Sequence, residues 1–306
     1  MEMPDRSARH LLDIGSLSDR DIEALIGRTV ELARGAPPQS CDVTTANLFF
    51  EPSTRTRVSF ELAASRLGMR VINIELERSS ATKGESLEDT VATLAAMGVD
   101  CLVARHPETG RLHRLVDAMA VPIRLLNAGD GQGEHPSQAI LDAATLAAGG
   151  IDWPRATIAI IGDVRHSRVA RSDMNLLARL GVGRLRIGGP SEMLPETLDN
   201  NRVEICTSLE AAVRDADVVM MLRVQRERMD RAGWPDPAQY HRHWGLTEAH
   251  LELARPACRV MHPGPINRGM EIDAAVADGP RSLILDQVRM GVYARMAIFE
   301  WMLELK

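Results

Sequence analysis

Short apolar runs alternate with longer amphipathic stretches along most of the chain. Each run is bounded by polar residues, glycine or proline, which is typical of a strand buried in a parallel sheet and followed by a helix. The pattern predicts strands at 46–50, 70–76, 99–105, 121–127, 157–163, 184–189, 203–206, 217–223 and 258–262. This alternation indicates an α/β protein.

Apolar residues at helical spacing predict the intervening helices. From Phe60 to Leu67 they recur at i, i+3, i+4 and i+7, which predicts a helix that begins at Ser53 and stops at Gly68. A second apolar face ends at Gly98. The stretch 286–306 predicts a terminal helix whose apolar side packs on the first domain.

The length of 306 residues favours two domains, because a single hydrophobic core usually stops growing before that size. Gly149, Gly150 and the Trp153-Pro154 pair interrupt the pattern. We therefore expect one domain over 1–148 plus 287–306 and another over 149–286. Each is expected to be a mostly parallel sheet flanked by helices, with the active site in the interdomain cleft.

Composition excludes several classes of function. The net charge of −6 and pI near 5.9 leave no general basic field for nucleic acid or an anionic membrane. No stretch approaches the length of a membrane span, so we expect a soluble, unprocessed protein. The four cysteines are scattered without C-x-x-C or zinc-finger spacing, which predicts a cytoplasmic location and neither metal nor cofactor.

Polar clusters directly follow the predicted strands. They are "EPSTRT", "RHP", "GEHPSQ", "VRHSR", "RVQRER" and "PGPINRG". Because ligands bind outside the carboxyl ends of strands in open α/β sheets, the clusters predict one cleft shared by two domains.

The chemistry of these clusters is dominated by donors. The candidate contact residues are Ser53, Thr54, Arg55, Thr56, Lys83, Arg105, His135, Gln138, Arg168 and Arg223. No serine or cysteine pairs with a histidine as a covalent nucleophile would. The helix start at "STRT" has no acid, although its macrodipole would favour one, which indicates an external anion. Each residue also has a structural interpretation: Ser53 and Thr54 as N-caps, and the His-Pro pairs as turns.

These motifs resemble the aspartate branch of the aspartate/ornithine carbamoyltransferase family. "FFEPSTRTRVSFE" and "HPSQAILD" match its carbamoyl-phosphate motifs, and "SSATKGESLEDT", "RVQRER" and "HPGPINRGMEI" match the aspartate branch. The resemblance runs from "RHLLDIGSLS" to the terminal helix. It implies transfer of the carbamoyl group of carbamoyl phosphate to the amine of L-aspartate, the committed step of pyrimidine synthesis.

The resemblance also implies a role for each site residue. Ser53, Thr54, Arg55 and Thr56 would bind the phosphate, and Thr56, Arg105 and His135 would polarise the carbonyl. Gln138 and the backbone of Gly264 and Pro265 would hold the amino group. Arg168, Arg223 and Gln225 would bind the aspartate carboxylates. Ser79 and Lys83 match a loop that reaches the neighbouring subunit's site, so the family implies a homotrimer, alone or with regulatory or dihydroorotase-like chains.

Three alternatives remain. The ornithine branch shares the phosphate motif but carries "HCLP" where this chain has "HPGP", and a cationic substrate suits Arg168 and Arg223 poorly. A dinucleotide-binding dehydrogenase would need G-x-G-x-x-G after 157–163, which is absent. A non-catalytic scaffold subunit would not need Lys83, His135 and Arg223 together.

Overall fold

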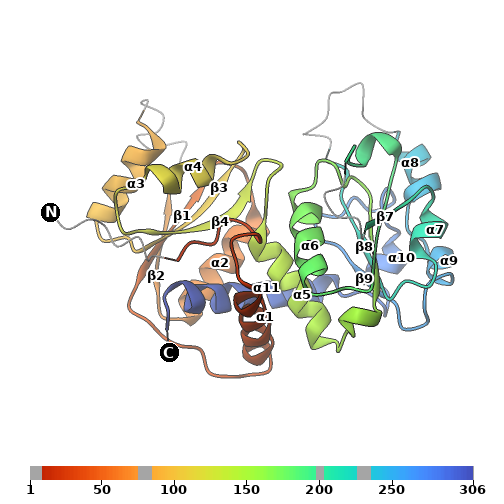
Figure 1. The fold of residues 1–306 in the computed structure, drawn as a ribbon, viewed down its shortest axis with the longest axis horizontal. Coiled ribbons are helices and arrows are strands. Elements are labelled where there is room, and N and C mark those ends of the chain that lie inside the picture. The colour runs from red at the N-terminus through yellow and green to blue at the C-terminus, as the bar shows by residue number, and fades with distance from the viewer. Residues whose placement is uncertain (1–8, 75–84, 198–202, 226–235, 306) are drawn as a thin grey trace. The chain divides into compact units, whose positions relative to one another are not determined.

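A computed structural model describes residues 9–74, 85–197, 203–225 and 236–305. The chain forms two compact units, Met1–Ala144 with Val288–Lys306 and Thr145–Gln287, so the first unit is built from two segments. Figure 1 shows the ribbon of the chain and its elements. Within the described residues, no helix is both long enough and apolar enough to cross a membrane.

Unit 1 contains a four-stranded sheet, sheet A, with strand order β2-β1-β3-β4 and every pair parallel. Its strands are β1 (Thr44–Phe49), β2 (Arg70–Ile74), β3 (Cys101–His106) and β4 (Arg124–Asp130). Its helices are α1 (Asp19–Ala33), α2 (Thr54–Arg66), α3 (Leu87–Ala96) and α4 (Arg111–Ala118), with most of α5 (Pro136–Ala148) and α11 (Ile284–Met302).

Both faces of sheet A carry helices, with α3 and α4 on one and α2 and α11 on the other (Figure 1). On the first face, Leu102 and Leu125 pack with Val91 and Leu112 in one buried cluster. On the second, Phe60 of α2 is buried and its ring meets Phe299 of α11 edge-on at 6.0 Å. The helix that ends the chain therefore completes the core of the unit that begins it.

Unit 2 contains a five-stranded sheet, sheet B, with order β7-β6-β5-β8-β9 and every pair parallel. Its strands are β5 (Thr157–Ile161), β6 (Arg184–Gly188), β7 (Val203–Cys206), β8 (Val218–Met221) and β9 (Arg259–Met261). Its helices are α6 (Arg168–Arg179), α7 (Leu209–Val213), α8 (Pro237–Trp244), α9 (Glu248–Leu251) and α10 (Ala274–Ala277), with 3-10 turns η3 (Trp153–Arg155) and η4 (Ser191–Met193).

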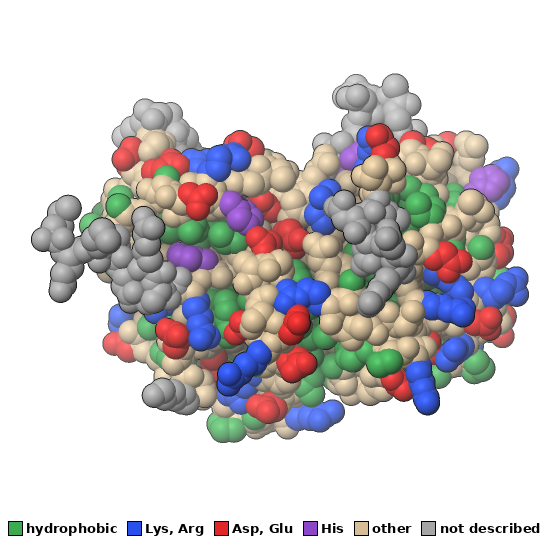
Figure 2. Space-filling view, in the orientation of Figure 1, with side chains coloured by type: hydrophobic (Ala, Val, Ile, Leu, Met, Phe, Trp, Pro, Cys, Tyr) green, Lys and Arg blue, Asp and Glu red, His purple; other side chains and the backbone are tan. Residues whose placement is uncertain are grey.

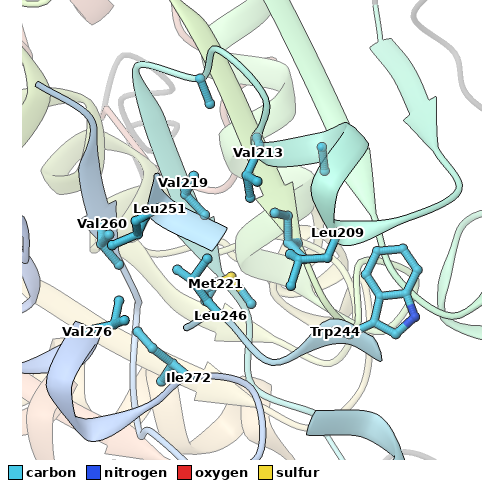
Figure 3. Close-up of a cluster of buried hydrophobic side chains, with 14 of the residues drawn as sticks. Leu209, Val213, Val219, Met221, Trp244, Leu246, Leu251, Val260, Ile272 and Val276 are labelled. Carbon is cyan, nitrogen blue, oxygen red and sulfur yellow. The ribbon is translucent and has the colours of Figure 1, made fainter. Parts of the chain in front are cut away.

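Sheet B is buried on both faces because its central strands are apolar at nearly every position rather than at alternate ones. Ile158 and Ile160 of β5 belong to the cluster that includes residues of α6. Ala159 and Ile161 of the same strand point into the other cluster, with residues of α7, α8, α9 and α10. Figure 3 shows this second cluster, which extends from Leu209 past Val219 to Val260.

The structure confirms the predicted fold class and all nine predicted strands, with shifts of up to three residues at their ends. The predicted helix at Ser53 begins at Thr54, with Ser53 as its N-cap. On the face of the protein in Figure 2, basic and acidic side chains of the described residues lie interspersed.

Candidate active site

In sheet A the order of strand addition reverses between β1 and β3, because β2 lies beyond β1 on one side and β4 beyond β3 on the other, while all four strands stay parallel. Binding crevices of open parallel sheets form at such a point, outside the carboxyl ends of the strands. Phe49 at the end of β1 pairs with Arg105 near the end of β3. The predicted residues that follow these two strands therefore start from adjacent points of one sheet edge.

The start of α2 differs from that of α3 in how its first N–H groups are satisfied. Ser53 is the N-cap of α2, yet its hydroxyl makes no capping bond, and the first turn contains no acid. By contrast, Ser86 caps α3 by accepting from Asp89 N at 3.0 Å. Since a helix start without a capping hydroxyl or an acid in its first turn attracts anions, this end of α2 can hold a phosphate.

The next residues of the motif differ in exposure. Thr54 and Arg55 are exposed, and the side chain of Thr56 is buried. The start of α2 therefore offers two kinds of donor, the short neutral hydroxyl of Thr56 and the long cationic side chain of Arg55.

Arg105 is held in position by an ion pair with Glu51 and a hydrogen bond to the backbone. Its Nε lies 3.1 Å from Glu51 Oε2, and its Nη1 donates to the Ala128 carbonyl at 3.3 Å. The side chain is 15 % exposed, so its charge acts in a medium less polar than water. Arg105 is thus a preoriented cation at the end of β3.

His135 and Gln138 follow β4, which is the neighbour of β3 in sheet A. The loop before His135 is braced by Asp130, whose carboxylate accepts from Gly110 N at 2.8 Å and Glu134 N at 2.7 Å. Both His135 and Gln138 are buried. The structure therefore brings Ser53, Thr54, Arg55, Thr56, Arg105, His135 and Gln138 to the carboxyl edge of sheet A.

In sheet B the corresponding switch lies between β5 and β8. Gly162 lets the two strand ends approach closely, because a Cβ there would lie 2.8 Å from the Leu222 carbonyl oxygen and its φ is +127°. The next residue, Asp163, is fully buried and accepts from Gln225 N at 3.2 Å and His166 Nδ1 at 2.7 Å. Burial raises the pKa of Asp163, and the hydrogen bond from His166 opposes that rise.

Arg168, Arg223 and Gln225 lie around this switch. Arg168 is the first residue of α6 and is buried, while Ser167 caps the helix by accepting from Ala170 N at 3.1 Å. Arg223 and Gln225 follow β8 and are partly buried, and Gln225 Nε2 donates to the His166 carbonyl at 3.1 Å. Two cations and one amide therefore gather at the carboxyl edge of sheet B.

Gly264 and Pro265 follow β9, at the edge of sheet B, and are joined by a cis peptide bond. Gly264 has a φ of +68°, which glycine adopts without strain, and its N–H donates to His262 Nδ1 at 2.8 Å. The buried His262 is held in turn by Gln287 and Glu271. The sequence predicted that the backbone of Gly264 and Pro265 belongs to the site. It did not predict that His262, Gln287 and Glu271 hold this backbone in place.

Ser79 and Lys83 lie outside the described residues. Within the described parts of the chain, no cluster of three or more histidine, cysteine or acidic side chains is arranged to hold a metal ion.

Sequence reasoning also missed the carboxylates that orient the predicted donors. Glu51 contacts Arg105, Asp163 anchors Gln225, and Asp142 accepts from Gln138. One signal was available, because Asp142 follows Gln138 by four residues and such pairs share a helix face.

The chain matches two family models. "Aspartate/ornithine carbamoyltransferase, carbamoyl-P binding domain" matches residues 9–148, and "Aspartate/ornithine carbamoyltransferase, Asp/Orn binding domain" matches residues 155–302.

Curated relatives and solved structures agree with these matches. The aspartate carbamoyltransferase catalytic subunit of Methylorubrum extorquens strain PA1 is 50% identical over 300 residues, which cover 95% of this chain and 94% of the relative. Aspartate transcarbamoylase of Trypanosoma cruzi, solved with carbamoyl aspartate and phosphate, is 30% identical with a TM-score of 0.84, covering 97% of both chains. The same enzyme solved with carbamoyl phosphate and aspartate gives a TM-score of 0.81 at 29% identity, covering 97% of this chain and 96% of that one.

Proposed function

This chain belongs to the aspartate/ornithine carbamoyltransferase family, and on that premise we propose that it carbamoylates L-aspartate. The amine of aspartate attacks the carbonyl carbon of carbamoyl phosphate, and the products are N-carbamoyl-L-aspartate and phosphate. This is the committed step of pyrimidine synthesis.

The proposal rests on two groups of hydrogen-bond donors and cations. One group lies at the carboxyl edge of each sheet, next to the point where the order of strand addition reverses. Unit 1 presents the uncapped start of α2 with Arg105, and unit 2 presents Arg168 and Arg223. Both substrates are anions, so each needs fixed cations and N–H donors. We assign carbamoyl phosphate to unit 1 and aspartate to unit 2.

In unit 1, the α2 start with Ser53, Thr54, Arg55 and Thr56 is proposed to bind the phosphate group. Thr56, Arg105 and His135 then surround the carbonyl oxygen, where negative charge develops as the amine attacks. A donor aimed at such an oxyanion stabilises the transition state by about 2.7–4 kcal/mol in other enzymes.

The proton balance needs no protein carboxylate as general base. When the tetrahedral intermediate collapses, the bond between carbon and the phosphate oxygen breaks. The departing phosphate accepts the proton of the amine. Holding both substrates in line for this transfer supplies much of the acceleration without a covalent enzyme intermediate.

In unit 2, Arg168, Arg223 and Gln225 are proposed to bind the two carboxylates of aspartate. The Gln225 position is supported by its bonds to Asp163 and the His166 carbonyl. Gly264 and Pro265 are proposed to accept from the carbamoyl amino group through their backbone carbonyls.

The aspartate interpretation outranks the ornithine one. A substrate with a cationic side chain would be repelled by Arg168 and Arg223, and the relatives described above are aspartate carbamoyltransferases. The experiment is an assay of phosphate release from carbamoyl phosphate with L-aspartate or L-ornithine. We expect turnover with aspartate, and its absence would refute the proposal.

We also propose that the chain forms a homotrimer through the α2 and β2 edge of unit 1. Strand β2 is an edge strand with mostly exposed residues, and Val58, Leu62 and Ile72 are large apolar side chains exposed there by more than 40%. A groove of about 440 Å³ lies between α2 and β2, lined in part by Val58 and Leu62. An exposed apolar surface on an edge strand favours association with another chain.

The trimer proposal includes Ser79 and Lys83 acting in the neighbouring subunit's site. The test mixes Arg55→Ala chains with Lys83→Ala chains after dissociation. If each site combines Arg55 of one chain with Lys83 of the next, random reassembly restores about a quarter of the wild-type sites. Failure of activity to return would refute the shared site but not the reaction.

The assembly state and location need separate measurements. Native mass determination distinguishes a trimer alone from trimers that bind regulatory or dihydroorotase-like chains. We propose a cytoplasmic location, supported by four free cysteines, since such compartments keep thiols reduced. Cell fractionation tests it.

A further inference from the structure

A buried carboxylate orients the amide of Gln138. Gln138 and Asp142 are four residues apart on α5, so their side chains share one helix face. Gln138 Nε2 lies 3.1 Å from each carboxylate oxygen of Asp142. Since an ionised carboxylate only accepts hydrogen bonds, the amide nitrogen must face it. The amide oxygen, on the other arm of the same planar group, is turned away.

Arg295 of α11 supports the negative charge of Asp142. Asp142 and Arg295 are both almost completely buried, at 2% and 3% exposure. Burial lowers the pKa of Arg295 to about 10, and the charge of Asp142 opposes that fall. The guanidinium is therefore charged at neutral pH, and it interacts electrostatically with the Asp142 carboxylate.

The Phe60 ring and the Gly291 backbone hold the Arg295 guanidinium in position. Its guanidinium lies 4.7 Å from the centre of the Phe60 ring, and its Nη1 donates to the Gly291 carbonyl at 2.8 Å. A Cβ on Gly291 would come within 2.6 Å of that Nη1. Elements from both segments of unit 1 thus hold this buried cation.

We propose that Asp142 is a positioning residue that selects the carbamoyl group by its amino end. With the amide nitrogen committed to Asp142, Gln138 can offer only its oxygen to the substrate. That oxygen accepts from the amino group of carbamoyl phosphate but finds no donor in the methyl group of acetyl phosphate. The inference rests on the proposed function, because it takes Gln138 to contact the carbamoyl amino group.

Acetyl phosphate is the matched probe, since it replaces the amino group by a methyl group of similar size. Its reaction is the same in form: the aspartate amine bonds to the acetyl carbon, and the bond from that carbon to the phosphate oxygen breaks. The phosphate leaves with the amine proton, and the product is N-acetyl-aspartate. The ratio of kcat/KM for carbamoyl phosphate to kcat/KM for acetyl phosphate therefore measures recognition of the amino group.

The test compares this ratio in Asp142→Asn, in Gln138→Met and in the double variant. In Asp142→Asn the carboxylate is replaced by an amide that can accept or donate, so the Gln138 amide is free to turn its nitrogen toward the substrate. We expect the ratio to fall about tenfold, which corresponds to about 1.4 kcal/mol. The double variant should match Gln138→Met, because the carboxylate acts only through the amide.

The control is Glu300→Gln, which removes another buried carboxylate of unit 1. Glu300 is 4% exposed and pairs with Arg28 at 2.6 Å, so its loss destabilises unit 1 without touching Gln138. Its ratio should equal that of the unsubstituted enzyme. If Asp142→Asn does not fold, Asp142→Asn with Arg295→Met removes both buried charges together and should show the same fall.

Three outcomes overturn the inference. One is an unchanged ratio in Asp142→Asn, and another is a loss in the double variant equal to the product of the two single losses. The third is a similar fall in Glu300→Gln. If the unsubstituted enzyme fails to carbamoylate aspartate, the proposed function fails, and the inference falls with it.

Discussion

The hydroxyl of Ser53 should contribute to anion binding and not to helix stability. The structure separates the two roles, because Ser53 is the N-cap of α2 without a capping bond, whereas Ser86 caps α3 through Asp89 N. Removing a working cap costs about 1 kcal/mol, so Ser86→Ala should lower the free energy of unfolding by that amount. Ser53→Ala should lower it by less than about 0.5 kcal/mol.

The same substitution should weaken binding of the phosphate group. A hydrogen bond to a charged partner contributes about 1.5–3 kcal/mol, so Ser53→Ala should raise the inhibition constant of inorganic phosphate about 10-fold to 150-fold. Ser86→Ala should leave that constant unchanged. Urea unfolding at one protein concentration, in phosphate-free buffer, measures the stability difference. An anion-binding role for Ser53 is excluded if Ser53→Ala destabilises the protein as much as Ser86→Ala while phosphate inhibits both variants equally.

Three further predictions use other parts of the structure. Asp163→Ala removes the acceptor of Gln225 N and should raise the KM for aspartate at least about tenfold, whereas Asp217→Ala, which frees Thr157 N at the amino end of β5, should not. Arg111 donates a hydrogen bond that lowers the pKa of Glu88. The pair therefore stabilises the protein fully at pH values above 4.5, the ordinary Glu pKa, and this contribution is lost as the pH falls through the lowered pKa of Glu88. Because the Glu88 side chain is 38 % exposed, solvent screens the pair, and Arg111→Gln should cost only about 0.5 kcal/mol at pH 7 and nothing in strong acid, by urea unfolding at both pH values. Three of the four thiols are buried with raised pKa, so a thiol reagent at neutral pH should modify at most one site per native chain and four after denaturation.

Sequence periodicity predicted the strands of both sheets but not all of their limits. The run 121–127 begins pairing only at Arg124 and continues to Asp130. A strand begins where its backbone first pairs with a neighbouring strand. Here β4 begins at Arg124 because Arg124 is the residue that pairs with Cys101 of β3. Such a partner lies elsewhere in the chain, so local pattern cannot supply it.

The donors of the candidate site were predictable for a physical reason. Parallel strands share one carboxyl edge, so polar residues after successive strands must lie near one another. The carboxylates that orient those donors were not predictable in the same way. Asp163 looks like any acid that follows a strand, and only the contact with Gln225, 62 positions away, shows what it does. Orientation is a tertiary property, whereas donor chemistry is local.

The two-segment construction of unit 1 sets the order in which the chain folds during synthesis. Unit 2 is continuous, so all five strands of sheet B have left the ribosome before α11 does. Until α11 emerges, Phe60 lacks its ring partner Phe299, and Asp142 lacks the charge of Arg295. Domains usually mature from the N-terminus during translation. Here the unit that holds the first strands is the last to finish, so the nascent chain carries an incomplete unit 1 through most of its synthesis.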